Sequence, residues 1–455
     1  MPQDTPMPNA TPDRPATVQR TTSRRAFIRS AAVLASALSS GGAFGGTAPF
    51  FAAGTRARGY RANSRIQVGL IGFGIRGKNT HGGFLDDADV EIISVTDVVA
   101  ERAAEGVRRI NERRKAEIAR IVPSWRDVVA DPSIDAALVT TPDHWHAEPA
   151  IAAAFAGKHV YCEKPLSLTI AEGRAISDAA RATRIRFQTG SQQRSEYGHM
   201  FVRAAEAVRN GRIGTIKRIT IGVGAPPIPC DLPEEPVPAG TDWDAWLGQA
   251  PMRGFNHELC PLGMHGHYPN WRRYREYCNG GLADMGAHHF DIAQWALAMD
   301  ESGPCEIIPP ADGAQTGLRF VYANGVEMIH GGPTDCTFFG TDGTIEVSRG
   351  HLRAYKGEDR AAPDAPELLA EPTGGDLRLP RNPSHIADFL SAIRDGHDPI
   401  CTAETGHRTA TICQLCNIGY EVGAPLTWNP ATERFTGANA DAANALTSRA
   451  VRPHR

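Results

Sequence analysis

The chain has 455 residues, enough for two or three domains, and its 41% hydrophobic and 22% charged residues are ordinary for a globular protein. A formal net charge of −3 gives no sign of a nucleic-acid or anionic-membrane partner. The nine cysteines are an odd number and cannot all pair within one chain. Cys413 and Cys416 form a CxxC inside an apolar helical run, so we expect buried core thiols, with redox or metal chemistry as the alternative.

Residues 1–54 have the features of an export signal. The first twenty are rich in Pro and Thr without periodicity, which is typical of disorder. Ser23-Arg24-Arg25-Ala26-Phe27 and the short, weakly apolar run after it are typical of a twin-arginine signal, and the run is too short to span a membrane. A basic leader or a chance arginine pair is the alternative. The sequence therefore predicts a substrate of the twin-arginine translocon that is periplasmic or otherwise exported. Because that route carries folded proteins, a cofactor can be loaded before export.

From about residue 64 to residue 188, short apolar strands alternate with helices. This pattern predicts βαβ units and a parallel sheet, here an N-terminal Rossmann domain that binds NAD(P). The expected strands are 66–71, 90–95, 134–140, 160–162 and 185–188, and the expected helices include 99–120, 149–157 and 170–184.

Residues 189–437 read as a second α/β domain with a large, mostly antiparallel open sheet, and the fold class is therefore α/β. Asn324-Gly325 and Asp342-Gly343 lie between short apolar runs, which is a strong hairpin signal. We expect residues 438–455 to form a flexible tail that frays. The expected helices are 200–210, 281–299, 384–394 and 404–422, with strands at 215–223, 318–322, 326–329, 336–339 and 344–347.

The first strand runs into a GxGxxG motif that opens a helix. Gly72 permits the tight turn, Gly74 lets the backbone approach a pyrophosphate at the helix N-terminus, and Gly77 permits close packing of helix on sheet. Asp97 follows Gly77 by 20 residues, at the end of the next strand, where it would accept hydrogen bonds from the adenosine ribose. A 2′-phosphate would meet this carboxylate as a like charge, which favours NAD over NADP. Ile75 and Arg76 complete the expected turn, and Arg76 would offset that charge.

Two further segments follow predicted strands. In open α/β sheets ligands bind beyond the carboxyl ends of the strands. We therefore expect cofactor contacts from Thr141, Pro142 and His146 in one segment, and from Glu163 and Lys164 in the other. The Lys164 amine is suited to polarise a carbonyl or to hydrogen-bond the hydroxyl that becomes one.

On the predicted helix 281–299, Asp284 and His288 are four residues apart and share a face. His288 is a natural base for a hydroxyl proton, and Asp284 would orient it and stabilise its charged form. A surface ion pair is the alternative. We expect no metal site, because His265 and His267 have no clear third ligand.

The combination VGLIGFGIRG, Asp97, TPDHWH, EKPLS and GGLADMGAHHFD resembles the Gfo/Idh/MocA oxidoreductases, the group of glucose–fructose oxidoreductase and inositol 2-dehydrogenase. The resemblance runs from about residue 64 to residue 437. It implies that Lys164, Asp284 and His288 line the substrate pocket beside the nicotinamide. It also implies that dimers or tetramers form, often through the sheet of the second domain.

Residues 225–279 depart from that resemblance because they are long and rich in aromatic and His residues. Aromatic rings stack on sugar faces, so the segment is suited to shape a carbohydrate pocket; a surface loop with its own small core is the alternative. The residues concerned are Trp243, Trp246, His257, His265, His267, Tyr268, Trp271 and Tyr274.

Three functions remain open from the sequence. The first is an NAD(P)-dependent oxidoreductase that moves a hydride between a sugar or glycoside hydroxyl carbon and a tightly bound nicotinamide. The second is redox-neutral glycoside cleavage or epimerisation through a transient keto-sugar. The third is a non-catalytic Rossmann scaffold, against which the intact Lys164, Asp284 and His288 argue.

Overall fold

The computed structural model describes residues 65–454. The twin-arginine motif and the rest of the leader lie outside these described residues. Within residues 65–454 no helix is long and apolar enough to cross a membrane.

The first sheet has six parallel strands in the order β3-β2-β1-β4-β5-β6. Its five predicted strands are confirmed. The predicted helix 99–120 is too long, because Lys115 adopts a left-handed conformation that ends the helix, and a two-residue strand follows. The strands are β1 (Ile66–Ile71), β2 (Val90–Thr96), β3 (Arg120–Ile121), β4 (Ala136–Val139), β5 (His159–Cys162) and β6 (Phe187–Thr189).

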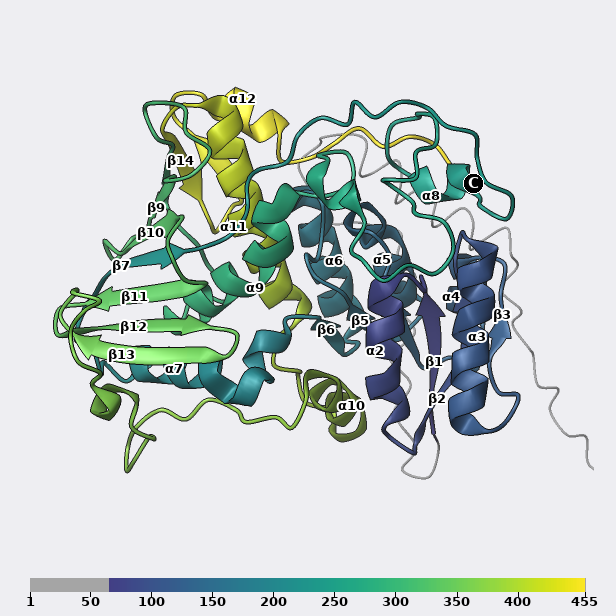
Figure 1. Cartoon of the computed structure of the whole chain (residues 1–455), viewed down its shortest axis with the longest axis horizontal. Helices are drawn as coiled ribbons and strands as arrows, with labels where there is room; N and C mark the ends of the chain where they lie inside the picture. The colour runs from purple at the N-terminus through teal and green to yellow at the C-terminus, as the bar shows by residue number, and fades with distance from the viewer. Residues whose placement is uncertain (1–64, 455) are drawn as a thin grey trace, which may run out of the picture. The chain divides into compact units, whose positions relative to one another are not determined.

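Helices cover both faces of this sheet, as a buried parallel sheet requires (Figure 1). One of them comes from far along the chain. Phe389, Leu390 and Ile393 of α10 pack into the same core as β1 and β2, so residue 188 is not the last residue of this half. The helices are α2 (Ile75–Leu85), α3 (Ala100–Arg114), α4 (Trp125–Ala130), α5 (Ala147–Phe155), α6 (Ile170–Thr183) and α10 (His385–Asp395).

The second sheet has nine strands in the order β13-β12-β11-β7-β10-β9-β8-β14-β15. Only β7 and β10 pair in parallel, so the expectation of a mostly antiparallel sheet is confirmed, as are both hairpins. The strands are β7 (Ile216–Ile221), β8 (Glu306–Ile308), β9 (Arg319–Val321), β10 (Glu327–His330), β11 (Cys336–Gly340), β12 (Gly343–Ser348), β13 (His351–Lys356), β14 (Leu426–Asn429) and β15 (Arg434–Thr436).

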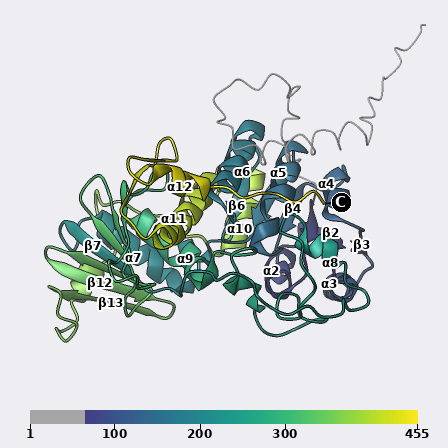
Figure 2. The same ribbon diagram turned by 90° about the horizontal axis from the view of Figure 1, so that it is seen from above.

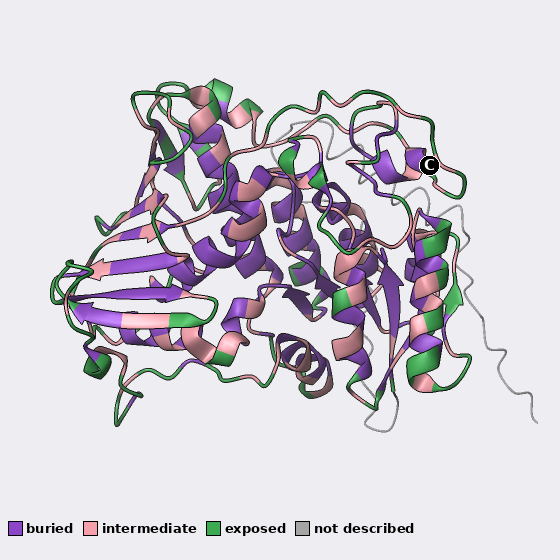
Figure 3. Cartoon of the chain, in the orientation of Figure 1, coloured by how far each residue is buried: buried purple, intermediate pink, exposed green. Residues whose placement is uncertain are grey.

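Three long helices accompany this sheet: α7 (Met200–Arg209), α9 (Gly280–Ala296) and α11 (Ala403–Val422). Figure 2 shows α7 and α9 on one side of the sheet, and Figure 3 shows α9 buried on nearly all sides. Cys413 and Cys416 are buried in α11 without a disulfide, and burial raises the pKa of both thiols, so they are core residues as expected.

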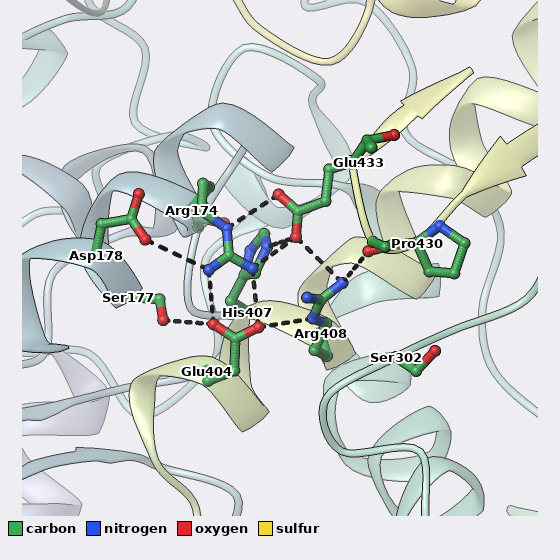
Figure 4. A network of polar contacts seen from close by, with 12 residues as sticks. Arg174, Ser177, Asp178, Ser302, Glu404, His407, Arg408, Pro430 and Glu433 are labelled. Carbon is green, nitrogen blue, oxygen red and sulfur yellow. Dashed lines mark hydrogen bonds and ion pairs between the residues drawn. The ribbon is translucent and has the colours of Figure 1, made fainter. Parts of the chain in front are cut away.

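Helices α6 and α11 are tied together by charged side chains that we call the inter-helix cluster: Arg174, Glu404, His407, Arg408 and Glu433 (Figure 4). Arg174 lies between two carboxylates, with Nη1 2.7 Å from Glu404 Oε2 and Nη2 2.6 Å from Glu433 Oε1. Arg408 contacts both carboxylates as well, at 2.7 and 3.2 Å. The cluster fixes the first half of the chain to the second.

The C-terminal residues do not fray as we expected from their Ala-rich composition. They form α12 (Ala440–Ala445) and then a strap, residues 449–454, which returns across the chain. Arg449 pairs with Glu172 and Arg452 with Asp244, at 2.8 and 2.7 Å. Long-range ion pairs therefore hold a segment whose local sequence has weak structural preference.

Candidate functional site

A cavity of about 1360 Å³ opens beyond the carboxyl ends of β1, β2, β4 and β5. It exceeds the roughly 300–1,000 Å³ of ordinary small-molecule pockets, so it has room for a dinucleotide and a substrate together. Its walls come from the first sheet, from α9 and from residues 237–272. The predicted site residues that line it are Gly72, Gly74, Ile75, Arg76, Asp97, Thr141, Pro142, Glu163, Lys164, Asp284 and His288.

The glycines of the turn perform separable tasks. Gly72 has φ +88°, which residues with side chains rarely adopt. A Cβ on Gly77 would lie 2.5 Å from the Gly72 carbonyl, so Gly77 sits under the turn rather than in the cavity wall. A Cβ on Gly74 would meet nothing within 4 Å and would point into open space. The turn therefore leaves backbone N–H groups at the start of α2 accessible, as a pyrophosphate requires.

Asp97 lies at the end of β2 and braces this turn. Its two carboxylate oxygens accept hydrogen bonds from the backbone N–H groups of Phe73 and Val99, at 2.6 and 2.9 Å. Burial raises the pKa of Asp97, while Arg102 and these two N–H groups oppose the rise. Each carboxylate oxygen keeps a second lone pair, so the group still has capacity for a ribose hydroxyl.

Arg76 turns away from Asp97 and pairs with Glu163. Burial alone would raise the pKa of Glu163, but the charges of Arg76 and Lys164 hold it below its ordinary value. Arg76 is thus engaged at the β5 side of the cavity and is not free to offset Asp97. Thr141 lines the cavity, and its buried Oγ1 lacks a partner among the described residues. An orphaned polar atom beside an open glycine turn fits a bound dinucleotide.

One expected cofactor contact is wrong. The ring of His146 is not part of the cavity wall; it lies between two backbone carbonyls, with Nδ1 2.7 Å from Pro165 O and Nε2 2.9 Å from Thr141 O. It therefore links the two loops that carry Thr141 and Lys164. Spacing could not reveal this, because the role depends on where the two loops meet.

Lys164 and Asp284 meet although 120 residues separate them. Lys164 Nζ donates to Asp284 Oδ1 at 2.8 Å and to the Asp284 carbonyl at 2.7 Å. Burial alone would raise the pKa of Asp284, but Lys164 and Arg272 bring it below its ordinary value. An ammonium has three protons, so one remains for a ligand in the cavity. Asp284 therefore orients Lys164 and not, as we expected, His288.

His288 lies one helical turn from Asp284 and is 4% exposed. Burial and then the positive charges of Lys164 and Arg349 hold the pKa of His288 well below its ordinary value. Its Nδ1 has no partner among the described residues. The ring is therefore neutral at physiological pH and able to accept a proton.

Residues 225–279 form a small core of their own and also contribute to the cavity wall. The segment has its own core, in which Trp243 and Trp246 stack at 4.7 Å and Phe255 packs against them. It also lines the cavity, through Trp243, Trp246, His265, Tyr268 and Trp271. Of the other aromatic and His residues in question, Tyr274 belongs to the core and His257 pairs with Glu235. No cluster able to hold a metal occurs within residues 65–454.

The structure adds cavity residues that sequence reasoning missed. Asp143 is buried, which raises its pKa to about 6. Arg272 lies 3.5 Å from Asp284 and over the ring of Trp271. Arg349, from the turn between β12 and β13, lies over the ring of Tyr197. Only Asp143 had a local signal, because it stands next to Pro142 at a strand end.

Two family models match the chain. Residues 66–191 match the oxidoreductase family with an NAD-binding Rossmann fold, and residues 229–455 match the C-terminal alpha/beta domain of the same family, Gfo/Idh/MocA. The two regions together cover most of the chain.

Relatives that match over most of their length are named as a dehydrogenase and a reductase. The chain is 24% identical to the scyllo-inositol 2-dehydrogenase (NADP(+)) IolW of Bacillus subtilis, over 77% of this chain and 93% of that one. It is 26% identical to the 1,5-anhydro-D-fructose reductase of Ensifer adhaerens, over 74% and 91%. A levoglucosan dehydrogenase solved with NADH and levoglucosan shares the fold, at 22% identity, a TM-score of 0.52 and coverage of 80% and 99%. The chain belongs to the Gfo/Idh/MocA family and is an NAD(P)-dependent oxidoreductase that acts on CH–OH groups.

Proposed function

We propose that the protein oxidises a secondary hydroxyl of a sugar or glycoside, with NAD held in the cavity throughout. The observation that carries this proposal is the Lys164–Asp284 pair, 2.8 Å apart, in the same cavity wall as the neutral His288. An ammonium beside a neutral imidazole is suited to a hydroxyl that must lose a proton as it loses a hydride.

Lys164, fixed by two hydrogen bonds to Asp284, directs its third proton to the substrate oxygen and stabilises the charge that develops there. His288 takes the proton of the hydroxyl. Bound NAD supplies the acceptor for the hydride that leaves the same carbon. Glu163, paired with Arg76, lines the cavity next to Lys164 and adds a negative charge beside the ammonium. Tyr268 and Trp271 offer ring faces to a sugar.

NAD rather than NADP is the proposed cofactor. Asp97 presents a carboxylate where a 2′-phosphate would lie, and Arg76 is committed to Glu163. The proposed location is outside the cytoplasm, after export by the twin-arginine route. Free nucleotide is scarce there, so a retained cofactor must be reoxidised in place, either by a second sugar or by return of the hydride to the same one.

The test is to purify the processed protein, denature it and identify any released nucleotide. We expect about one NAD per chain, and a nicotinamide spectrum that changes when a sugar substrate is added to the native protein. NADP instead would contradict the role given to Asp97. A protein that holds no nucleotide and binds none when it is added would contradict the proposal. Release of an aglycone with no net change in NADH would identify redox-neutral glycoside cleavage instead.

A further inference from the structure

The cavity wall carries charged side chains of both signs, among them the cations Arg76, Lys164, Arg272 and Arg349. Arg76 is paired with Glu163, whereas Lys164 and Arg272 share one carboxylate, that of Asp284.

Arg349 is the cation without a carboxylate. Its side chain makes no ion pair within residues 65–454; Asp335 accepts a hydrogen bond only from its backbone N–H, at 3.3 Å. The pKa of Glu196 is raised, chiefly by burial; Arg349 opposes this rise, but the two are not paired. Arg349 is exposed on its turn and lines the cavity, and its guanidinium has no carboxylate partner among the described residues.

Arg349 is also held in place. Its guanidinium carbon lies 4.8 Å from the centroid of the Tyr197 ring, and Tyr197 lines the same cavity. Stacking on an aromatic face restricts the guanidinium plane and leaves the N–H edge accessible. The positive charge of Arg349 helps to lower the pKa of His288, after the larger effects of burial and of Lys164. Arg349 and His288 line the same cavity.

We propose that the substrate is an anionic sugar, whose carboxylate, phosphate or sulfate is bound by Arg349 while Lys164 and His288 face the hydroxyl to be oxidised. This inference rests on the proposed function and narrows its substrate class. A guanidinium fork matches these planar or tetrahedral anions through paired N–H bonds. The anion supplies the negatively charged partner that Arg349 lacks among the described residues.

Binding of such an anion also bears on His288. The groups that act on its ring are Lys164, Arg349, His289 and Arg76, all of them positive or basic, and they disfavour protonation of His288. A bound anion beside Arg349 opposes them and so makes His288 a stronger base when substrate is present. A neutral sugar has no such effect.

The experiment compares matched sugars on the nucleotide-loaded protein. Binding of D-glucuronate is measured against D-glucose, and D-galacturonate against D-galactose, by calorimetry, which needs no turnover. D-glucose 6-phosphate forms a third arm, which separates a carboxylate from a phosphate. We expect at least one acid to bind about ten-fold or more tightly than its neutral partner, because charged hydrogen bonds are the strong ones.

The variant Arg349→Gln should remove this preference, because the tighter binding of the acid is assigned to the Arg349 guanidinium. Arg349→Lys should keep part of it. Lys356→Gln is the matched control, because it removes one exposed charge from β13 without touching the cavity, and it should keep the preference in full. Where turnover is measurable, Arg349→Gln should raise KM for the acid more than it lowers kcat.

The inference is overturned if no acid binds more tightly than its neutral partner, or if the preference survives in Arg349→Gln. These results differ from failure of the proposed function. If the protein holds NAD and reduces it equally well with neutral sugars, the proposed function stands and only the proposal of an anionic substrate is contradicted. If the protein neither holds nor binds nucleotide, both the proposed function and the anionic substrate are contradicted.

Discussion

Two groups of charged side chains in this chain differ in how completely they are compensated. In the inter-helix cluster, Arg174 and Arg408 face Glu404 and Glu433, and His407 Nε2 donates to Glu433 at 2.7 Å (Figure 4). Burial and the arginine charge keep His407 less basic than usual, with a lowered pKa. Both arginines thus have carboxylate partners, and Asp178 lies 3.5 Å from Arg174 as well. In the cavity, by contrast, Lys164 and Arg272 share Asp284, and Arg349 has no carboxylate partner among the described residues.

The difference teaches what each group is for. A compensated buried network holds two elements together, and removal of one member leaves the others buried and unpaired. An uncompensated group of cations is costly to maintain, so it is expected where a ligand supplies the missing charge. The inter-helix cluster therefore governs folding and the cavity group governs activity, and each can be disturbed separately.

The largest effect is expected from Lys164→Met. Loss of the ammonium should lower kcat by about 10²–10⁴-fold, the usual contribution of one positioned proton donor, while the nucleotide content stays the same. Turnover is measured by steady-state kinetics, and nucleotide is quantified after denaturation. Lys164→Arg keeps the charge but alters its position and should recover only part of the activity. Unchanged turnover in Lys164→Met would remove Lys164 from the reaction.

The opposite pattern is expected from Arg174→Met. This change leaves Glu404 and Glu433 facing each other with only Arg408 between them. It should lower the free energy of unfolding by about 2–3 kcal/mol, measured by urea denaturation, with unchanged turnover in the folded protein. Arg181→Met on the same helix is the control, because the side chain of Arg181 is 70% exposed, and its loss should cost less than about 1 kcal/mol. Equal losses of unfolding free energy in Arg174→Met and Arg181→Met would contradict the role of the inter-helix cluster in stability.

The inter-helix cluster should also make stability depend on pH. Burial opposes it, but hydrogen bonds from His407 and Arg174 lower the pKa of Glu433 from 4.5 to about 2. The pKa of Glu404 is lowered as well, against burial, chiefly by hydrogen bonds from Arg174 and Ser177. A carboxylate with a lowered folded-state pKa contributes stability above its unfolded pKa and loses it as pH falls.

We therefore expect the urea midpoint of the wild type to fall progressively between about pH 5 and pH 2. The fall should be shallower in Arg174→Met, because the Arg174 hydrogen bonds, which contribute to both lowered pKa values, are gone. Parallel pH profiles for the two proteins would show that other carboxylates dominate acid unfolding.

The smallest effect is expected at the strap, residues 449–454. Arg452 holds α8 (Trp243–Leu247), the helix whose tryptophans line the cavity, through Asp244 at 2.7 Å. Asp244 is 47% exposed, so the pair is weak. Arg452→Ala should speed dissociation of the nucleotide by about two- to five-fold, measured by exchange with labelled NAD. Arg434→Ala, an exposed arginine on β15 without an ion pair among the described residues, should leave the rate unchanged. A rate that does not change in Arg452→Ala would separate the strap from retention of the cofactor.

Local sequence predicted the first sheet well because its signals are local. Apolar runs of branched residues ending at Gly72, Thr141 and Glu163 become parallel strands, and parallel strands bring their carboxyl ends to one edge. The cofactor turn and the Lys164 loop were therefore predictable together. The same reasoning placed His146 in the cavity wrongly, because the direction of a side chain in a loop depends on what packs against it.

The sequence by itself determined the Rossmann half, the helix that carries Asp284 and His288, and the family, since these follow from periodicity, turn chemistry and motif spacing. Tertiary structure alone decided that Asp284 holds Lys164, that α10 joins the first core, and that the C-terminal strap is anchored. It also decided that Arg272 and Arg349 enter the cavity beside residues far away in the chain. The physical reason is that such contacts depend on long-range packing and charge pairing, which leave no pattern in the residues that flank each partner.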